Sequence, residues 1–184
     1  MRVLNILTKL FFFGLIAFAL AGRNLPQFEG KGMEFRAFTF PLAPLAIFLY
    51  WRFSRRGQPY PYLAETLILL PFIIDLFGNA ANLYDTYVHY DDVCHFLNWV
   101  LLVSGLGMLI APKIQSRLVL FFLMFGLGSI THTLREIGEY IGMKSGAGRL
   151  FLTYEDTLGD FILSLAGSFV GAALCAALFT GQKQ

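Results

Sequence analysis

Histidine and aspartate recur four residues apart in one stretch of this chain. The pattern Asp-x-x-x-His occurs twice there, as Asp85 with His89 and as Asp91 with His95. Residues four apart share one face of a helix, so the two groups of each pair can act together. An imidazole beside a carboxylate suits both divalent-metal binding and proton transfer. His95, at the start of an apolar stretch, is therefore the strongest candidate for a ligand or a base.

Three other apolar stretches carry polar side chains at helical spacing. These side chains are Asp75, Asn79 and Asn82 in the first stretch, His132, Glu136 and Glu139 in the second, and Asp156 and Asp160 in the third. An ionisable side chain at membrane depth costs several kcal/mol unless it is paired, hydrated or bound to a metal. The cations nearest in sequence, Arg135, Lys144 and Arg149, are too few to pair with all the acids. The sequence therefore predicts one intramembrane pocket with a functional role.

A divalent metal with mixed ligands, or protons shared between carboxyl groups, would offset the surplus negative charge of this pocket. We expect a metal, of unspecified identity, to be held by Asp91, His95, Glu139 and Asp160. Glu136 and Asp156 are the expected catalytic residues, with Glu136 as the general base. The expected secondary polar residues of the pocket are Asp75, Asn79, Asn82 and His132.

Structural roles would also explain several of these residues. Asp156 could cap the last helix, and Arg135 could form an ion pair with Glu139 along one helical face. His132 could be a packing residue whose nitrogens are satisfied. Asn79 and Asn82 could form hydrogen bonds between helices. Solvent-exposed loop positions would account for Asp85, Asp92 and Glu155.

The elements that must position these residues are transmembrane helices. Of the 184 residues 57% are apolar, 16% aromatic and 14% charged, a composition too apolar for a soluble domain. A bilayer helix needs about 20 apolar residues. Apolar stretches lie at 4–21, 37–53, 62–84, 92–111, 118–142 and 157–180. The sequence thus predicts an all-α, polytopic transmembrane helix bundle of about six spans, forming a single membrane domain over 1–184, with Pro41 and Pro44 weakening the second span.

Charge and cysteine usage exclude several other classes of protein. The net charge of +2 and the scattered basic residues argue against a nucleic-acid partner. Cys94 and Cys175 lie in different apolar stretches, which argues against a disulfide framework and against a short-spaced redox or metal motif. Residues 1–22 fit a retained first helix better than a cleaved signal peptide, because the apolar run is longer than a usual signal core.

Loop charges predict the orientation in the membrane. Seven Lys and Arg residues lie on the side with both termini (Arg2, Arg52, Arg55, Arg56, Lys113, Arg117 and Lys183) and five on the other (Arg23, Lys31, Arg36, Lys144 and Arg149). This bias predicts a protein of the inner (cytoplasmic) membrane with both termini in the cytoplasm. Of the twelve acidic residues only Glu65 falls near the predicted cytoplasmic end, so the pocket should lie near the extracytoplasmic face.

Three short motifs in this order resemble a known family. They are Asp91-x-x-x-His95-Phe96, then Glu136-x-x-Glu139, then Asp156-Thr157-x-x-Asp160 followed by a glycine-rich helix. Residues 70–175 resemble the VanZ-like and YjdF-like bacterial integral membrane proteins. The resemblance implies a helical membrane architecture and a polar set of Asp91, His95, Glu136, Glu139, Asp156 and Asp160. The VanZ-like pattern usually has Gln where Glu139 stands and Asn where Ser164 stands, which favours the YjdF-like branch and implies little about activity.

The pocket leaves three functions open at this point. The first is a metal-dependent enzyme that hydrolyses or transfers a group of a membrane lipid or lipid-linked substrate at the outer boundary of the membrane. The second is a transporter or sensor in which the carboxylates bind a cation or relay protons. The third is an accessory subunit of a membrane assembly, in which the polar residues fix the helix register.

Overall fold

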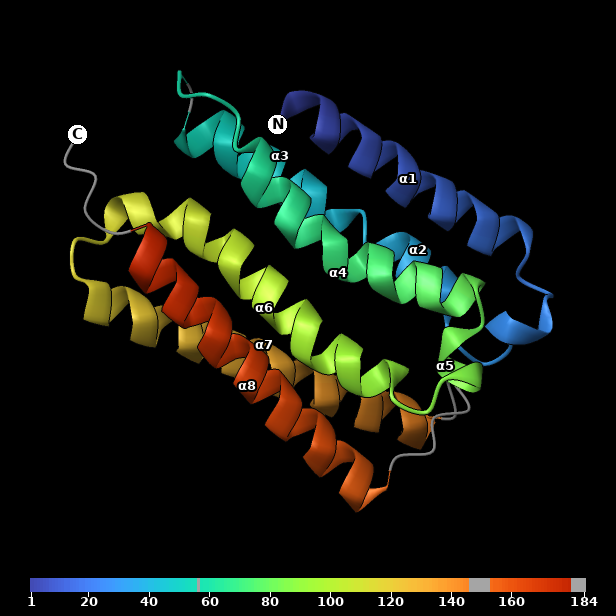
Figure 1. Cartoon of the computed structure of the whole chain (residues 1–184). Coiled ribbons are helices and arrows are strands. Elements are labelled where there is room, and N and C mark those ends of the chain that lie inside the picture. Colours follow the sequence, from blue (N-terminus) through green and yellow to red (C-terminus); the bar gives the residue numbers. More distant parts are fainter. Residues whose placement is uncertain (56, 146–152, 180–184) are drawn as a thin grey trace.

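The chain folds into a bundle of long helices, shown in Figure 1 as a computed structural model that describes residues 1–55, 57–145 and 153–179. The long helices are α1 (Arg2–Ala21), α4 (Tyr62–Ala80), α6 (Tyr90–Ile110), α7 (Arg117–Ser145) and α8 (Tyr154–Leu178). The short ones are η1 (Pro26–Phe28), α2 (Met33–Thr39), α3 (Leu42–Ser54), α5 (Leu83–Thr86) and η2 (Ala111–Lys113). The described residues contain no strand, so the predicted all-α bundle is confirmed.

Five segments of the described chain are long and apolar enough to cross a membrane. They are Arg2–Ala21, Tyr62–Ala80, Tyr90–Lys113, Arg117–Lys144 and Tyr154–Leu178. Many large apolar side chains on these helices point outward, as expected where lipid rather than water surrounds the bundle. The chain is therefore a multi-pass membrane protein.

The predicted count of six spans is wrong, because the stretch at 37–53 is not one helix. It is divided between α2 and α3, with Phe40 and Pro41 between them. Pro41 has no backbone N–H to donate, and its ring would clash with the carbonyl of a preceding helical turn, so the first helix ends before it. The 13 residues of α3 span about 20 Å, less than the hydrocarbon core of roughly 30 Å.

Together α2 and α3 still return the chain along the bundle. In Figure 1, α1, α4 and α7 run from upper left to lower right, whereas α6 and α8 run in the opposite direction. The ends of α4 and α7 therefore meet the starts of α6 and α8 at one end of the bundle. This end holds Asp75, Asp91, Glu136 and Asp160, and we refer to it as the acidic end.

The opposite end is the basic end, which holds Arg2, Arg52, Arg55, Lys113 and Arg117. The first residues of α1 and the last residues of α8 both lie there. Three cations of the predicted orientation, Arg56, Arg149 and Lys183, fall outside the described residues.

Helix α6 lies at the centre of the bundle and packs against α4 on one side and α8 on the other, while α7 packs mainly on α8. Glycines permit the closest of these approaches. A Cβ at Gly171 of α8 would lie 2.9 Å from Val103 Cβ of α6, and one at Gly167 would overlap the Phe96 carbonyl oxygen. Bare backbone at these positions brings α6 and α8 together and thereby brings their polar first turns together.

Candidate functional site

His95 is the centre of the polar cluster at the acidic end. It lies in the second turn of α6, where its side chain is only 2% exposed. Its Nδ1 is 3.0 Å from the hydroxyl of Ser164 on α8, and its Nε2 is 3.3 Å from Asp160 Oδ1. Asp91, one turn earlier on α6, places Oδ1 3.7 Å from the same Nε2. The predicted pairing of Asp91 with His95 on one helical face is confirmed, and α8 adds Asp160.

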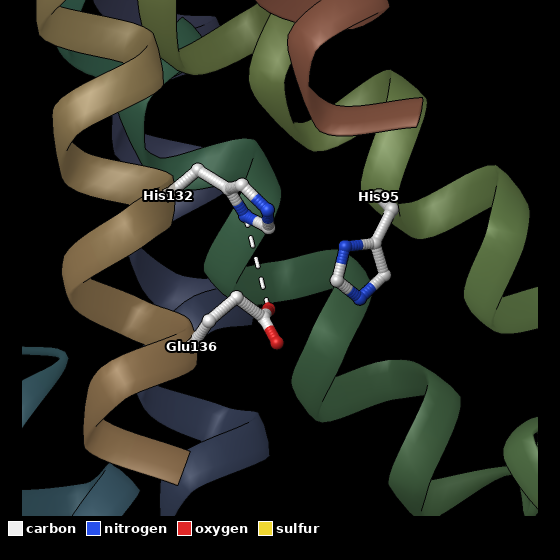
Figure 2. Close-up of side chains that lie close together, drawn as sticks. All are labelled: His95, His132 and Glu136. Atoms are coloured by element: carbon white, nitrogen blue, oxygen red, sulfur yellow. Dashed lines mark ion pairs between the residues drawn. The ribbon is translucent and has the colours of Figure 1, made fainter. Parts of the chain in front are cut away.

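His132 faces His95 from α7 (Figure 2) and is fully buried. Its ring packs against Phe161 at 4.5 Å, Trp99 at 5.5 Å and His95 at 5.9 Å between ring centroids. Neither of its nitrogens has a hydrogen-bond partner among the described residues. His132 therefore packs among rings, as one alternative from sequence allowed, but without the hydrogen bonds that a buried imidazole normally forms.

Glu136 lies one turn beyond His132 on α7, and its side chain is 5% exposed. Its Oε1 is 3.8 Å from His132 Nδ1, the contact drawn in Figure 2. The other carboxylate oxygen, Oε2, is buried and, within the described chain, has no hydrogen-bond partner. Burying an unpaired carboxylate oxygen is costly, so this atom and the two nitrogens of His132 are the atoms of the cluster that are free to bind a cation or a hydrogen-bond donor.

Arg135 covers the cluster from its more exposed side. The guanidinium Nη1 is 3.0 Å from His95 Nε2 and 3.3 Å from Glu136 Oε1, and Nη2 is 2.6 Å from Glu139 Oε1. The ion pair of Arg135 with Glu139, one of the alternatives from sequence, is therefore confirmed. Arg135 thus pairs with Glu136 and Glu139, while Asp91 and Asp160 contact His95, so the cluster has four carboxyl groups and one guanidinium.

Two sets of potential ligand atoms in this cluster each lie within 4.8 Å of one another. One set comes from His95, His132 and Glu136, and the other from Asp91, His95 and Asp160. The first set fits a metal better, because all three residues are buried and three of its donor atoms are unpartnered. Two imidazoles with one carboxylate form a ligand set that Zn²⁺ and related ions prefer.

The structure places two of the expected site residues at the edge of the cluster. Glu139 is one-quarter exposed and binds Arg135, outside both sets of potential ligand atoms. Asp156 is exposed in the first turn of α8, where its backbone N–H donates to Thr153 Oγ1 at 3.1 Å. Thr153, rather than Asp156, is therefore the cap of this helix. The negative charge of Asp156 lies in the first turn, where it interacts favourably with the positive end of the helix dipole.

The polar residues at the end of α4 belong to a separate network. Asp75 accepts hydrogen bonds from Arg36 Nε at 2.8 Å and from the Tyr84 hydroxyl at 3.3 Å. Asn79 donates to the Asp75 carbonyl within its own helix, at 2.8 Å, rather than to another helix. Burial and the nearby Asp75 carboxylate raise the pKa of Tyr84, so that its hydroxyl remains a donor. This network fastens α2 to α4 and not to the His95 cluster.

Asn82 shows why the end of α4 departs from a simple helical stripe. It has a positive φ of 57° and precedes α5, so the chain turns there instead of continuing as a helix. Asp85 and His89 consequently do not pair: Asp85 binds Lys31 at 2.7 Å and His89 binds Asp92 at 2.9 Å, and of these four side chains all but Lys31 are largely exposed.

Ser164 and Arg135 both contact His95, and neither is among the site residues expected from the sequence. Ser164 is fully buried and holds His95 Nδ1, which fixes the orientation of that ring. Its spacing was the available signal, since Asp160, Ser164 and Ser168 are four apart and lie on one face of α8. Arg135 was visible as an ion-pair partner, but its contact with His95 depends on tertiary structure.

No protein-family model matches this chain, and no curated protein or solved structure is significantly similar to it.

Proposed function

We propose that this membrane protein binds a divalent transition metal through His95, His132 and Glu136, and that it acts as a metal-dependent hydrolase or transferase on a lipid or lipid-linked substrate. The observation that carries the proposal is the buried His132, whose two nitrogens form no hydrogen bond within the described chain, beside Glu136 Oε2, which forms none either. A cation at this point would satisfy these atoms and offset part of the surplus negative charge.

The proposed ligands suit hydrolytic chemistry. A metal held by two imidazoles and a carboxylate supplies a water whose pKa is lowered toward 7 and a Lewis acid for a carbonyl or phosphoryl oxygen. Ser164 orients His95 through Nδ1 and leaves Nε2 facing the cluster. Asp160, 3.3 Å from that nitrogen and buried, is the carboxylate best placed to hold a proton during the reaction.

The surroundings of the site favour an amphiphilic substrate. Asp91 and Arg135 have side chains 44% and 43% exposed, so they form the accessible edge of an otherwise buried cluster. Large apolar side chains beside this edge are also exposed, including Val93, Leu97 and Leu158. A substrate with an apolar part in the membrane and an anionic group that Arg135 binds would fit both features.

The packing of α8 supports the transporter alternative less than it supports a site that opens at one end of the bundle. The polar face formed by Asp160, Ser164 and Ser168 is followed, toward the basic end, by Ala172 and Cys175. These two residues belong to a fully buried apolar layer with Val103, Leu120 and Met124. We define these five residues as the apolar layer. Its position favours a site reached from one end over a polar path through the bundle.

The resemblance to VanZ-like and YjdF-like proteins, a bacterial inner-membrane location and cytoplasmic termini belong to the same proposal. They agree with the clustering of Lys and Arg at the basic end, where the first residues of α1 and the last of α8 lie. In that orientation the metal site is near the extracytoplasmic face. Tags accessible at each terminus in intact or opened cells would test the orientation.

Metal content of the purified protein tests the proposed function. We expect about one transition-metal ion per chain by elemental mass spectrometry, and loss of that ion in His132→Ala and Glu136→Gln. His89→Ala is the matched control, because His89 is exposed, with a side chain 83% accessible, and lies outside both ligand sets. Wild-type protein that holds no metal after supply of Zn²⁺, Mn²⁺, Fe²⁺ or Co²⁺, or a His132→Ala variant that retains it, would contradict the proposal.

A further inference from the structure

A second cluster of charged side chains lies in a groove between α1, α3 and α4, away from the metal site. Glu65 of α4 is fully buried, and its Oε2 is 2.7 Å from Lys9 Nζ of α1. Its Oε1 accepts a hydrogen bond of 2.7 Å from the Tyr60 hydroxyl. The carboxylate thus has one cation and one hydroxyl donor beside it. The Lys9 ammonium carries three N–H donors, so donors remain after it binds Glu65, and its side chain is one-third exposed.

The groove into which Lys9 points has a volume of about 700 Å³. This volume lies within the range of small-molecule binding sites. Its wall toward the membrane is apolar and formed by Phe13, Leu45 and Phe48, all of which are partly exposed. Trp51 and Tyr60 stand at its polar end with ring centroids 5.2 Å apart. An apolar wall that leads to an ammonium group and two amphipathic rings matches the boundary between lipid tails and headgroups.

Charge at this end of the bundle favours an anionic ligand. Besides Lys9, the basic end holds Arg2, Arg52, Arg55, Lys113 and Arg117. Of the twelve acidic residues, all of which lie in the described part of the chain, Glu65 alone is near this end, and Lys9 neutralises it. The field at the mouth of the groove is therefore positive, as in other segments that attract anionic lipids.

We propose that the groove between α1, α3 and α4 binds an anionic glycerophospholipid. One acyl chain lies against Phe13, Leu45 and Phe48, and the headgroup phosphate accepts hydrogen bonds from Lys9. Lys9 lies seven positions after Arg2, about 10 Å along the axis of α1, which is a depth suited to the phosphate and glycerol region. This site is independent of the proposed metal site and lies at the opposite end of the bundle.

Tryptophan fluorescence in vesicles tests the groove directly, because the protein has two tryptophans and one of them, Trp51, lines it. In a Trp99→Phe background, brominated phosphatidylglycerol and brominated phosphatidylcholine would be compared as quenchers at equal mole fractions. The reference reporter is Phe122→Trp in a background that also carries Trp51→Phe and Trp99→Phe. Phe122 is exposed near the basic end on α7, so it reports the general attraction of anionic lipid to that end.

We expect the relative binding of anionic over zwitterionic lipid to be about fivefold higher at Trp51 than at the reference reporter. That factor corresponds to ~1 kcal/mol, the attraction of one lysine for an anionic headgroup. Lys9→Gln together with Glu65→Gln should reduce the preference to the reference level without leaving a buried charge, and Lys9→Arg should retain it. Helical circular dichroism and a single size-exclusion peak would confirm that each variant is folded.

Three results would overturn the proposal. Equal lipid preference at Trp51 and at the reference reporter would show that the groove has no lipid selectivity of its own. A preference that survives in a folded protein with both Lys9→Gln and Glu65→Gln would remove Lys9 from the interaction. Relief of the Trp51 quenching by millimolar inorganic phosphate in vesicles of constant composition would show that the site takes free phosphate. The metal content of protein that retains Trp99, which packs against His132, reports on the other site independently.

Discussion

Two glycines on α7 allow the contribution of close helix packing to be measured with a matched pair of substitutions. Gly126 and Gly128 lie near the middle of the same helix, two residues apart. A Cβ at Gly126 would have no neighbour within 4 Å, whereas a Cβ at Gly128 would lie 2.7 Å from Ser168 Cβ and 2.8 Å from Val103 Cγ2. Both neighbours are fully buried, so they have little room to move.

Alanine has the same intrinsic effect at both positions. It favours the helix over glycine by ~1 kcal/mol, so Gly126→Ala should leave the free energy of unfolding unchanged or raise it by up to that amount. At Gly128 the same gain is opposed by overpacking, which costs about 1–3 kcal/mol. We therefore expect Gly128→Ala to be less stable than Gly126→Ala by about 1–3 kcal/mol, and to be neutral to destabilised relative to the wild type.

The measurement is unfolding in mixed micelles as the SDS fraction is raised, monitored by circular dichroism. Adding Ser168→Gly to Gly128→Ala removes the side chain that the new methyl group meets. The double variant should therefore be more stable than the sum of the two single substitutions predicts. Identical stability of Gly126→Ala and Gly128→Ala would refute the reasoning, because it would mean that α7 and α8 are not in contact at Gly128.

Two ion pairs give further predictions. Lys9→Ala leaves the fully buried Glu65 carboxylate without its cation and should lower the free energy of unfolding by roughly 3 kcal/mol. Adding Glu65→Gln removes the buried charge and should recover most of this stability. Arg36→Ala should cost about 1–3 kcal/mol because it removes both the ion pair and the hydrogen bonds to the partly buried Asp75. Arg23→Ala is its control, with a change within about 0.5 kcal/mol, since the Arg23–Glu34 pair is largely exposed. An Arg23 variant as unstable as the Arg36 variant would contradict this assignment.

Local sequence patterns were sufficient to predict the long helices and most of the polar cluster. The recurrence of Asp91 and His95, and of His132 and Glu136, at intervals of four follows from helical periodicity, and the structure places all four near one another. The apolar stretches predicted the spans because a bilayer demands about 20 apolar residues. These are properties of single helices, which do not depend on how the helices pack.

Features that depend on tertiary structure were not predictable in the same way. The ion pair between Arg36 and Asp75 forms only because the segment after α1 folds back onto α4. No periodicity in the sequence predicts that course of the chain. For a similar reason the sequence did not show that Glu139 binds Arg135 and lies outside both sets of potential ligand atoms, whereas His132 belongs to one of them. The weakness at Pro41 was visible in sequence, but the expectation of one span over 37–53 was wrong.

The apolar layer of Val103, Leu120, Met124, Ala172 and Cys175 has a consequence for how the acidic end is supplied with protons. These side chains are fully buried and lie between the polar face of α8 and the basic end. None of the five side chains is charged, so a proton moving from the cluster toward the basic end along α6, α7 and α8 would meet an apolar barrier. For the proposed metal site, this layer predicts proton exchange with the aqueous compartment at the acidic end, so that turnover there would not discharge the membrane potential.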